Sequence, residues 1–449
     1  MIAGTFAGIL CSALLTLSGP EFAKNVLHQP VAGMCISIMA PAIVFEIMTG
    51  VWKGYFEGNG SHIPSSHSIV IKSVVMITAS LISTGILYRY GQKVSALLQD
   101  SIYAAAYGAI GISIGILISS VVGFLHILFV FLIYRKSSGR KEQLKNQDRG
   151  QHIFRMLMGT ALPFMIYALL GRGILLLDGI LFIRQKEGTA DTVLLWGNYY
   201  GKCLPVLGIM IMFCIVFHEG YIRRIIYFMD REDFRMAREI MAEFMQHIIL
   251  ISFPVAVFTA VFSENLLNLF FKGNNASLAQ AVATGSILIP LFAISYACAE
   301  LLVRMRKMRY VLSLEGIAAI THGILMIVLL QSMGDSLFGI LIAQIVPLAV
   351  FTVLSFILVL RGIQYRIDYM RRLAFPAATA AAAGLVCLAF NKLLSSFAGS
   401  TVSMIICIPV GIVIYIILLL IFKAISEDEI QKLPLAGMIL FIGKLTRLL

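Results

Sequence analysis

Seven charged side chains lie inside long apolar segments, where a charge is costly and is usually kept for a function. A charge at the centre of a bilayer costs about 2.5–3.5 kcal/mol on insertion scales, so such residues tend to face a cavity or a partner. Basic side chains there can bind anionic groups by charge-assisted hydrogen bonds, and carboxylates can take up a coupling ion. The seven residues are Glu46, Lys72, Arg172, Asp178, Lys202, Glu300 and Glu315.

Arg172 is the strongest single candidate for binding an anion, because it is deep in its apolar segment between two glycines. Asp178 follows six residues later, about 240° further around a helix at 3.6 residues per turn. The two side chains therefore do not share a face, and we expect that they do not neutralise each other within one helix.

Lys202 is a second basic candidate, with an asparagine and two tyrosines nearby, although it could lie toward the outer surface. Glu46 and Lys72 complete the set of candidate cavity residues. We expect Lys72 to lie about one turn inside the cytoplasmic surface and to extend its amine to the water there. Glu300 and Glu315 are predicted to pair with the basic residues of 304–307.

The sequence contains no motif for a covalent or metal-assisted reaction. There is no P-loop, H-E-x-x-H or nucleophile elbow, and none of the seven cysteines forms a C-x-x-C pair. His126 and His322 stand alone in apolar segments and are predicted to be packing residues. We therefore expect a protein that is not an enzyme and that needs no cofactor and no metal.

The composition predicts a polytopic helical membrane protein. Of the 449 residues, 59% are hydrophobic and only 13% are charged, whereas soluble domains have about a quarter of their residues charged. The net charge of +12 is explained by basic loops between spans, so no nucleic-acid partner is expected. The partner expected from composition is the lipid bilayer.

Each membrane span requires about 20 apolar residues, and the sequence contains twelve such segments. Eight of the twelve prolines fall inside them and predict kinks or breaks. The predicted limits are 2–19, 31–52, 69–87, 104–134, 154–183, 193–217, 246–263, 280–302, 311–331, 337–360, 373–392 and 400–422.

The polar run Arg135–Arg149 fixes the predicted orientation, because it holds six basic residues between two apolar segments. Lys and Arg are retained on the cytoplasmic side. Placing this run inside puts both termini inside, with 24 Lys and Arg residues in inside loops against seven in outside loops. The inside loop 218–245 contains an apolar face formed by Met236, Ile240 and Phe244, which predicts an interfacial helix leading into the next span.

Several stretches, in order, resemble the multidrug/oligosaccharidyl-lipid/polysaccharide (MOP) exporter superfamily. The similar branch contains the polysaccharide transporters, the stage V sporulation protein B-like group and the lipid II flippases. The stretches that carry the resemblance are Gly54–Gly58, Ala161-Leu162-Pro163 with the later Asp178, Phe253–Ala256, Asn268–Gly273, and Ser426–Ile430 with Leu433-Pro434.

The resemblance implies a MATE-like fold of two helix bundles plus two further helices. That branch has fourteen helices, so the chain is expected to lack the first two and to have an incomplete N-terminal bundle. The expected domains are 1–134 (four spans), 135–153 (cytoplasmic linker), 154–361 (six spans) and 362–449 (two spans and a tail).

The resemblance further implies a flippase or exporter of a polyprenyl-pyrophosphate-linked saccharide in a bacterial plasma membrane, working by alternating access. Without an ATP site, the membrane potential or a gradient of H+ or Na+ would drive it, with Asp178 as a coupling carboxylate. Two alternatives remain open. One is a drug or cation antiporter of the same superfamily, with Glu46 and Asp178 in an acidic cavity. The other is a non-transporting scaffold or truncated product.

Overall fold

The computed structural model describes residues 2–138, 150–185, 189–273, 275–333, 337–365, 367–425, 427–431 and 436–446. Most of the predicted basic linker lies outside these ranges. The described residues form helices joined by short turns, without strands. They include 12 helical segments long and apolar enough to cross a membrane, and these correspond one to one to the predicted spans. The expected all-helical, polytopic fold is confirmed.

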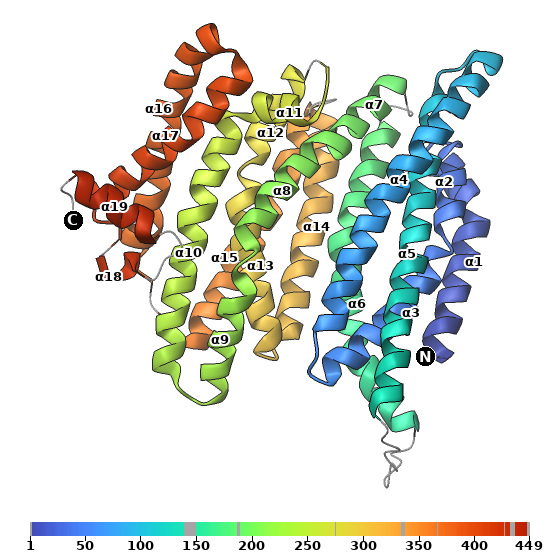
Figure 1. Ribbon diagram of the computed structural model, residues 1–449, viewed down its shortest axis with the longest axis horizontal. Helices are drawn as coiled ribbons and strands as arrows, with labels where there is room; N and C mark the ends of the chain where they lie inside the picture. The colour runs from blue at the N-terminus through green and yellow to red at the C-terminus, as the bar shows by residue number, and fades with distance from the viewer. Residues whose placement is uncertain are drawn as a thin grey trace. The chain divides into compact units, whose positions relative to one another are not determined.

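The chain divides into two compact units, and the first comprises Met1–Gly150 and Ile183–Gly188. A break separates its second and third helices at Pro41, which has no backbone N–H to continue a helix. The fourth predicted span, long enough to have been two helices, is a single helix. The helices are α1 (Ile2–Asn25), α2 (Ala32–Met39), α3 (Ala42–Gly58), α4 (Ile63–Leu98) and α5 (Ile102–Ser138), drawn in blue to teal in Figure 1.

Helices α4 and α5 lie side by side along most of their length (Figure 1). Glycines allow the close approach: a Cβ added to Gly111 would lie 2.5 Å from the Cα of Thr84, and one added to Gly91 would lie 3.0 Å from the carbonyl oxygen of Tyr103. Gly111 and Gly115 form a G-x-x-x-G pair on the face of α5 toward α4. Small residues at this spacing are typical of packed membrane helices, because they let two backbones approach.

The second unit comprises Gln151–Phe182 and Thr189–Leu449. Its main apolar core includes buried residues of α8, α10, α12, α13, α14 and α15, and a second cluster joins α16, α17 and α19. The elements are α6 (Gly150–Gln185), α7 (Ala190–Asn198), η1 (Tyr199–Cys203), α8 (Leu204–Ile215), α9 (His218–Asp230), α10 (Phe234–Val261), α11 (Ser263–Phe270), α12 (Ala276–Gly285), α13 (Leu288–Arg304), α14 (Met308–Met333), α15 (Leu337–Ile363), η2 (Met370–Ala374), α16 (Phe375–Ala398), α17 (Ser400–Ile421), α18 (Glu427–Ile430) and α19 (Ala436–Thr446).

Two of these elements, η1 and η2, are single π-helical turns, and each comes just before a proline, Pro205 or Pro376. A proline cannot donate the backbone bond that an α-helix requires, and a wider turn before it accommodates the loss. Both turns carry cations: Lys202 in η1, and Arg371 with Arg372 in η2. π-helical turns are frequent at functional sites.

Helix α10 begins directly after an acidic residue that caps its first turn. Asp233 is its N-cap residue and accepts a hydrogen bond from the backbone N–H of Met236 at 3.1 Å. The helix continues from this amphipathic segment unbroken into the next span, as the sequence predicts. The side chains of Ile240 and Phe244 are buried in the protein core, so this apolar face packs against protein.

Candidate functional site

Asp178, on α6, is the centre of a buried polar network. Its side chain is fully buried, and that of His322, on α14, is almost fully buried. Oδ1 of Asp178 lies 2.6 Å from Nε2 of His322, and Oδ2 accepts a hydrogen bond from Nε2 of Gln344, on α15, at 3.0 Å. Both oxygens of the carboxylate therefore face nitrogen atoms that carry or can carry hydrogen.

The network continues on both sides of this centre. The hydroxyl of Tyr199, in η1, donates to Oε1 of Gln344 at 2.8 Å. Nδ1 of His322 lies 2.7 Å from the carbonyl oxygen of Ala343. A cavity of about 120 Å³ lies beside the centre, with Asp178 and His322 in a wall otherwise formed by apolar residues and glycines of α6 and α14.

The network joins four elements, and its members are up to 166 residues apart in the sequence. Sequence reasoning identified Asp178 but assigned His322 to packing, and it did not use Gln344. One feature of the sequence could have linked Asp178, His322 and Gln344: all three are polar residues inside apolar spans, and such residues usually face the protein interior. Helical periodicity does not tell which spans are neighbours, so the partnership itself was not predicted.

Arg172 lies on the same helix as Asp178 but on a different face, as the sequence predicted. Its side chain is exposed, whereas Asp178 is fully buried. Arg172 makes no ion pair or hydrogen bond within the described ranges. It is twelve residues before the Arg184 end of the span, which corresponds to about 18 Å along a helix. A permanently charged group at this depth, without a counter-charge in the described protein, is suited to bind an anion.

Lys202 has a neutral partner. Its amine donates to Oδ1 of Asn275, in the turn before α12, at 3.4 Å. Asn275 is itself buried and donates to the side chain of Asn268 and to the backbone carbonyl of Phe271. Lys202 thus lies beside the turn between α11 and α12.

Glu46 and Lys72 form an ion pair in the first unit. Nζ of Lys72, on α4, lies 2.5 Å from Oε1 of Glu46, on α3, and Ser120, on α5, donates to the same oxygen at 2.5 Å. The exposed fractions are 29% for the Lys72 side chain and 41% for that of Glu46. The amine of Lys72, which we expected to extend to surface water, binds a carboxylate on the neighbouring helix.

One of the two carboxylates predicted to pair with 304–307 does so. Oε1 of Glu300 accepts from Nε of Arg304 at 2.9 Å, and Arg304 also binds Glu219, on α9, at 2.8 Å. Burial raises the pKa of Glu219, but hydrogen bonds from Arg223 and Arg304 outweigh this effect. The pKa of the carboxyl group is therefore lower than its usual value. Glu315 makes no ion pair among the described residues, so that part of the prediction is wrong.

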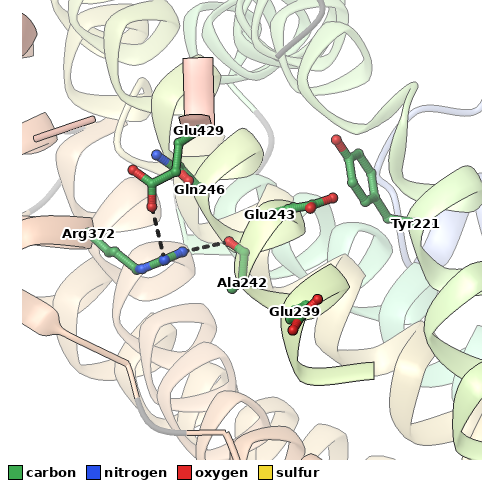
Figure 2. Close-up of a pocket in the computed structure, with 7 residues that line it drawn as sticks. All are labelled: Tyr221, Glu239, Ala242, Glu243, Gln246, Arg372 and Glu429. Atoms are coloured by element: carbon green, nitrogen blue, oxygen red, sulfur yellow. Dashed lines mark hydrogen bonds and ion pairs between the residues drawn. The ribbon is translucent and has the colours of Figure 1, made fainter. Parts of the chain in front are cut away.

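A second cavity, of about 180 Å³, lies where α10 meets η2 and α18 (Figure 2). Arg372 spans it, donating to the carbonyl of Ala242 at 2.9 Å and to Glu429 at 3.2 Å. Arg371 binds the other oxygen of Glu429 at 3.0 Å. Burial, followed by the charge of Glu243, raises the pKa of the Tyr221 hydroxyl in its wall. These charges bind one another and tie α18 to the rest of the unit.

The described side chains contain no group of three or more His, Cys, Asp or Glu that could hold a metal ion. All seven cysteines are free thiols. The five candidate residues do not form one cluster: Glu46 pairs with Lys72 in the first unit, while Asp178, Arg172 and Lys202 occupy three different environments in the second.

The comparisons with known proteins agree with the resemblance inferred from the motifs. No family model matches the chain. Stage V sporulation protein B of Bacillus subtilis (strain 168) is 22% identical over 444 residues, covering 96% of this chain and 82% of that protein. The structure titled lipid II flippase MurJ, inward closed conformation, superposes with a TM-score of 0.64 at 15% identity, covering 94% of this chain and 82% of that one. The resemblance to this branch of the MOP superfamily is confirmed.

Proposed function

We propose that this chain, a relative of the sporulation protein B and lipid II flippase branch, is a membrane flippase or exporter of a lipid-linked saccharide. The substrate we propose is a polyprenyl-pyrophosphate-linked precursor of polysaccharide or peptidoglycan, moved by alternating access across a bacterial plasma membrane. The solved relative is named a lipid II flippase, and the likeness extends over nearly the whole chain.

The observation that carries this proposal is the unpaired charge of Arg172. Guanidinium binds phosphate oxygens through two parallel hydrogen bonds and cannot be neutralised by losing a proton. A pyrophosphate that crosses hydrocarbon requires such a group, and Arg172 makes no ion pair or hydrogen bond within the described ranges. Lys202 is a weaker candidate, because its amine already contacts Asn275.

The two acidic candidates do not favour the alternative of a drug or cation antiporter. Such a transporter requires a carboxylate free to bind a cationic substrate. Glu46 is bound by Lys72, and both oxygens of Asp178 face nitrogens of His322 and Gln344. Asp178 instead remains our candidate for binding the coupling ion, H+ or Na+.

Lipid binding by the purified protein tests the proposal. Native mass spectrometry with added polyprenyl-pyrophosphate saccharide should show a bound lipid for the wild-type chain and its loss in Arg172→Glu. Arg172→Lys should retain part of the binding, since it keeps the charge but loses the bidentate geometry.

Arg155→Glu is the matched control, because Arg155 is exposed on the same helix but lies at the end of the span. Undiminished lipid binding in Arg172→Glu would contradict the assignment of Arg172. Absence of binding by the wild-type chain would contradict the proposed substrate.

A further inference from the structure

The protonation of the Asp178–His322 pair follows from what each atom faces. Nδ1 of His322 lies 2.7 Å from the carbonyl oxygen of Ala343. A carbonyl oxygen only accepts hydrogen bonds, so Nδ1 must carry a hydrogen atom and donate it. Nδ1 therefore carries its hydrogen whether the imidazole ring is neutral or is a protonated imidazolium.

The other ring nitrogen, Nε2, lies 2.6 Å from Oδ1 of Asp178. A bare nitrogen lone pair and an ionised carboxylate oxygen would repel each other at this distance, so a second hydrogen must lie between them. Either the imidazolium donates to the carboxylate, or the carboxylic acid donates to the neutral imidazole. Both arrangements contain one proton more than an ionised aspartate beside a neutral histidine.

We propose that Asp178 and His322 together bind one proton, and that this proton is the coupling ion of transport. The proton binding stands on the geometry alone, whereas the coupling role rests on the proposed function. The pair is neutral with the proton bound. When the proton leaves, only an N–H or O–H bond breaks, and a carboxylate and a neutral imidazole remain.

The same contacts argue against Na+ at this site. Hard cations such as Na+ require several oxygen ligands that point their lone pairs at the ion. Three oxygens contact the ring of His322 or the amide nitrogen of Gln344: Oδ1 and Oδ2 of Asp178 and the carbonyl of Ala343. Each of them faces a nitrogen donor, and a fourth oxygen, Oε1 of Gln344, accepts from the hydroxyl of Tyr199. A metal cation would have to displace His322 and Gln344 from all three.

Loss of the proton would change the stability of this packing. The Asp178 side chain is fully buried and that of His322 is 5% exposed, so an ionised aspartate alone would be an uncompensated buried charge. The network joins α6 to α14 and α15, and the adjoining cavity of about 120 Å³ has room for water beside both side chains. Release of the proton therefore favours a rearrangement that admits water or separates these helices, which is the event that coupling requires.

The other charged and titratable groups around the pair do not substitute for the proton. The Tyr199 hydroxyl, in η1, bonds to Gln344, and Lys202 of the same turn bonds to Asn275. On α14, Glu315 is two turns from His322, and on α6, Arg172 is exposed on another face. Within the described ranges, no basic side chain other than His322 pairs with Asp178.

Electrometry of reconstituted protein tests the proton site without any lipid-linked saccharide. Full-length protein in liposomes on a solid-supported membrane is exposed to a step in pH at constant Na+, and separately to a step in Na+ at constant pH. We expect charge displacement with the pH step and none with the Na+ step. The signal should be lost in Asp178→Asn and in His322→Gln, and kept in Glu315→Gln, the matched carboxylate control on α14.

Infrared difference spectra provide a second measurement, whose first result comes from the wild-type chain alone. A pH step should produce bands of a carboxyl group or an imidazolium that changes protonation, absent from Asp178→Asn where that variant is folded. Charge displacement by Na+ but not by H+, or a proton signal retained in a folded Asp178→Asn, would overturn the proposal. A proton signal without binding of the saccharide lipid would contradict the proposed function and leave the proton site standing.

Discussion

At the residue scale, the intramembrane charges differ in how they are balanced. Lys72 is balanced by Glu46, with Ser120 as an additional donor, and Asp178 is balanced by His322 and Gln344. Arg172 has no counter-charge within the described protein. Because a charge inside a bilayer costs several kcal/mol unless it is paired, we propose that the first two serve structure or proton binding and that Arg172 binds an external anion.

The Glu46–Lys72 pair should contribute to the stability of the first unit. Lys72→Met would leave the carboxylate without its counter-ion, which costs at most about 2.5–3.5 kcal/mol at the bilayer centre, and less here because both side chains are partly exposed. The double variant Glu46→Gln/Lys72→Met should recover part of this loss, since it removes both charges. Thermal unfolding of the wild-type chain, the single variants and the double variant forms a double-mutant cycle, which gives the coupling energy between the two side chains. A double variant no more stable than Lys72→Met would show that the pair is not coupled.

The sequence identified which residues carry charge into the membrane but not how they are paired. It placed Arg172 and Asp178 on different faces correctly, because that depends only on the geometry of one helix. It missed the partnership of Lys72 with Glu46 and of Asp178 with His322, because these depend on which helices are neighbours. Hydrophobic periodicity describes a helix relative to its own axis and contains no information on its neighbours.

At the scale of the elements, apolar length determined most of what could be predicted. All twelve segments predicted from hydropathy are helices, since a span must bond its own backbone polar groups within lipid. The local irregularities were predicted only as kinks at prolines. Two of them are π-helical turns that carry cations, and turn type depends on neighbouring contacts as well as on the proline itself.

The interface between α4 and α5 should be sensitive to the smallest added side chain. Gly111→Ala would place a Cβ 2.5 Å from the Cα of Thr84, so the two helices must move apart. Overpacking of this kind costs typically about 1–3 kcal/mol. The matched control is Gly85→Ala on α4, where an added Cβ meets nothing within 4 Å and where alanine is the better helix former.

Thermal unfolding in the same detergent compares these two variants. Gly111→Ala should unfold at a lower temperature than the wild-type chain, and Gly85→Ala should unfold at the same or a higher one. Equal unfolding temperatures for the two variants would mean that the close approach of α4 and α5 does not contribute to stability.

At the scale of the whole molecule, the distribution of basic residues predicts the orientation in the membrane. The twelve candidate spans among the described residues place Ile2 and Thr446 on the same side, and the 24 basic residues in one set of loops against seven in the other predict that this side is the cytoplasm. The turn near Lys202, between α11 and α12, would then face outward, and the α9–α10 turn would face the cytoplasm.

Cysteine labelling in intact cells tests this orientation. Asp100 lies in the turn between α4 and α5 and Glu232 in the turn between α9 and α10, both exposed, and the charge distribution predicts opposite sides for them. A membrane-impermeant maleimide should label Asp100→Cys directly and Glu232→Cys only after permeabilisation, with labelling of the wild-type chain as the baseline. The reverse pattern would invert the whole molecule and the direction of transport. Labelling of both positions in intact cells would mean that the number of spans between them is even rather than odd, because an odd number must place them on opposite sides.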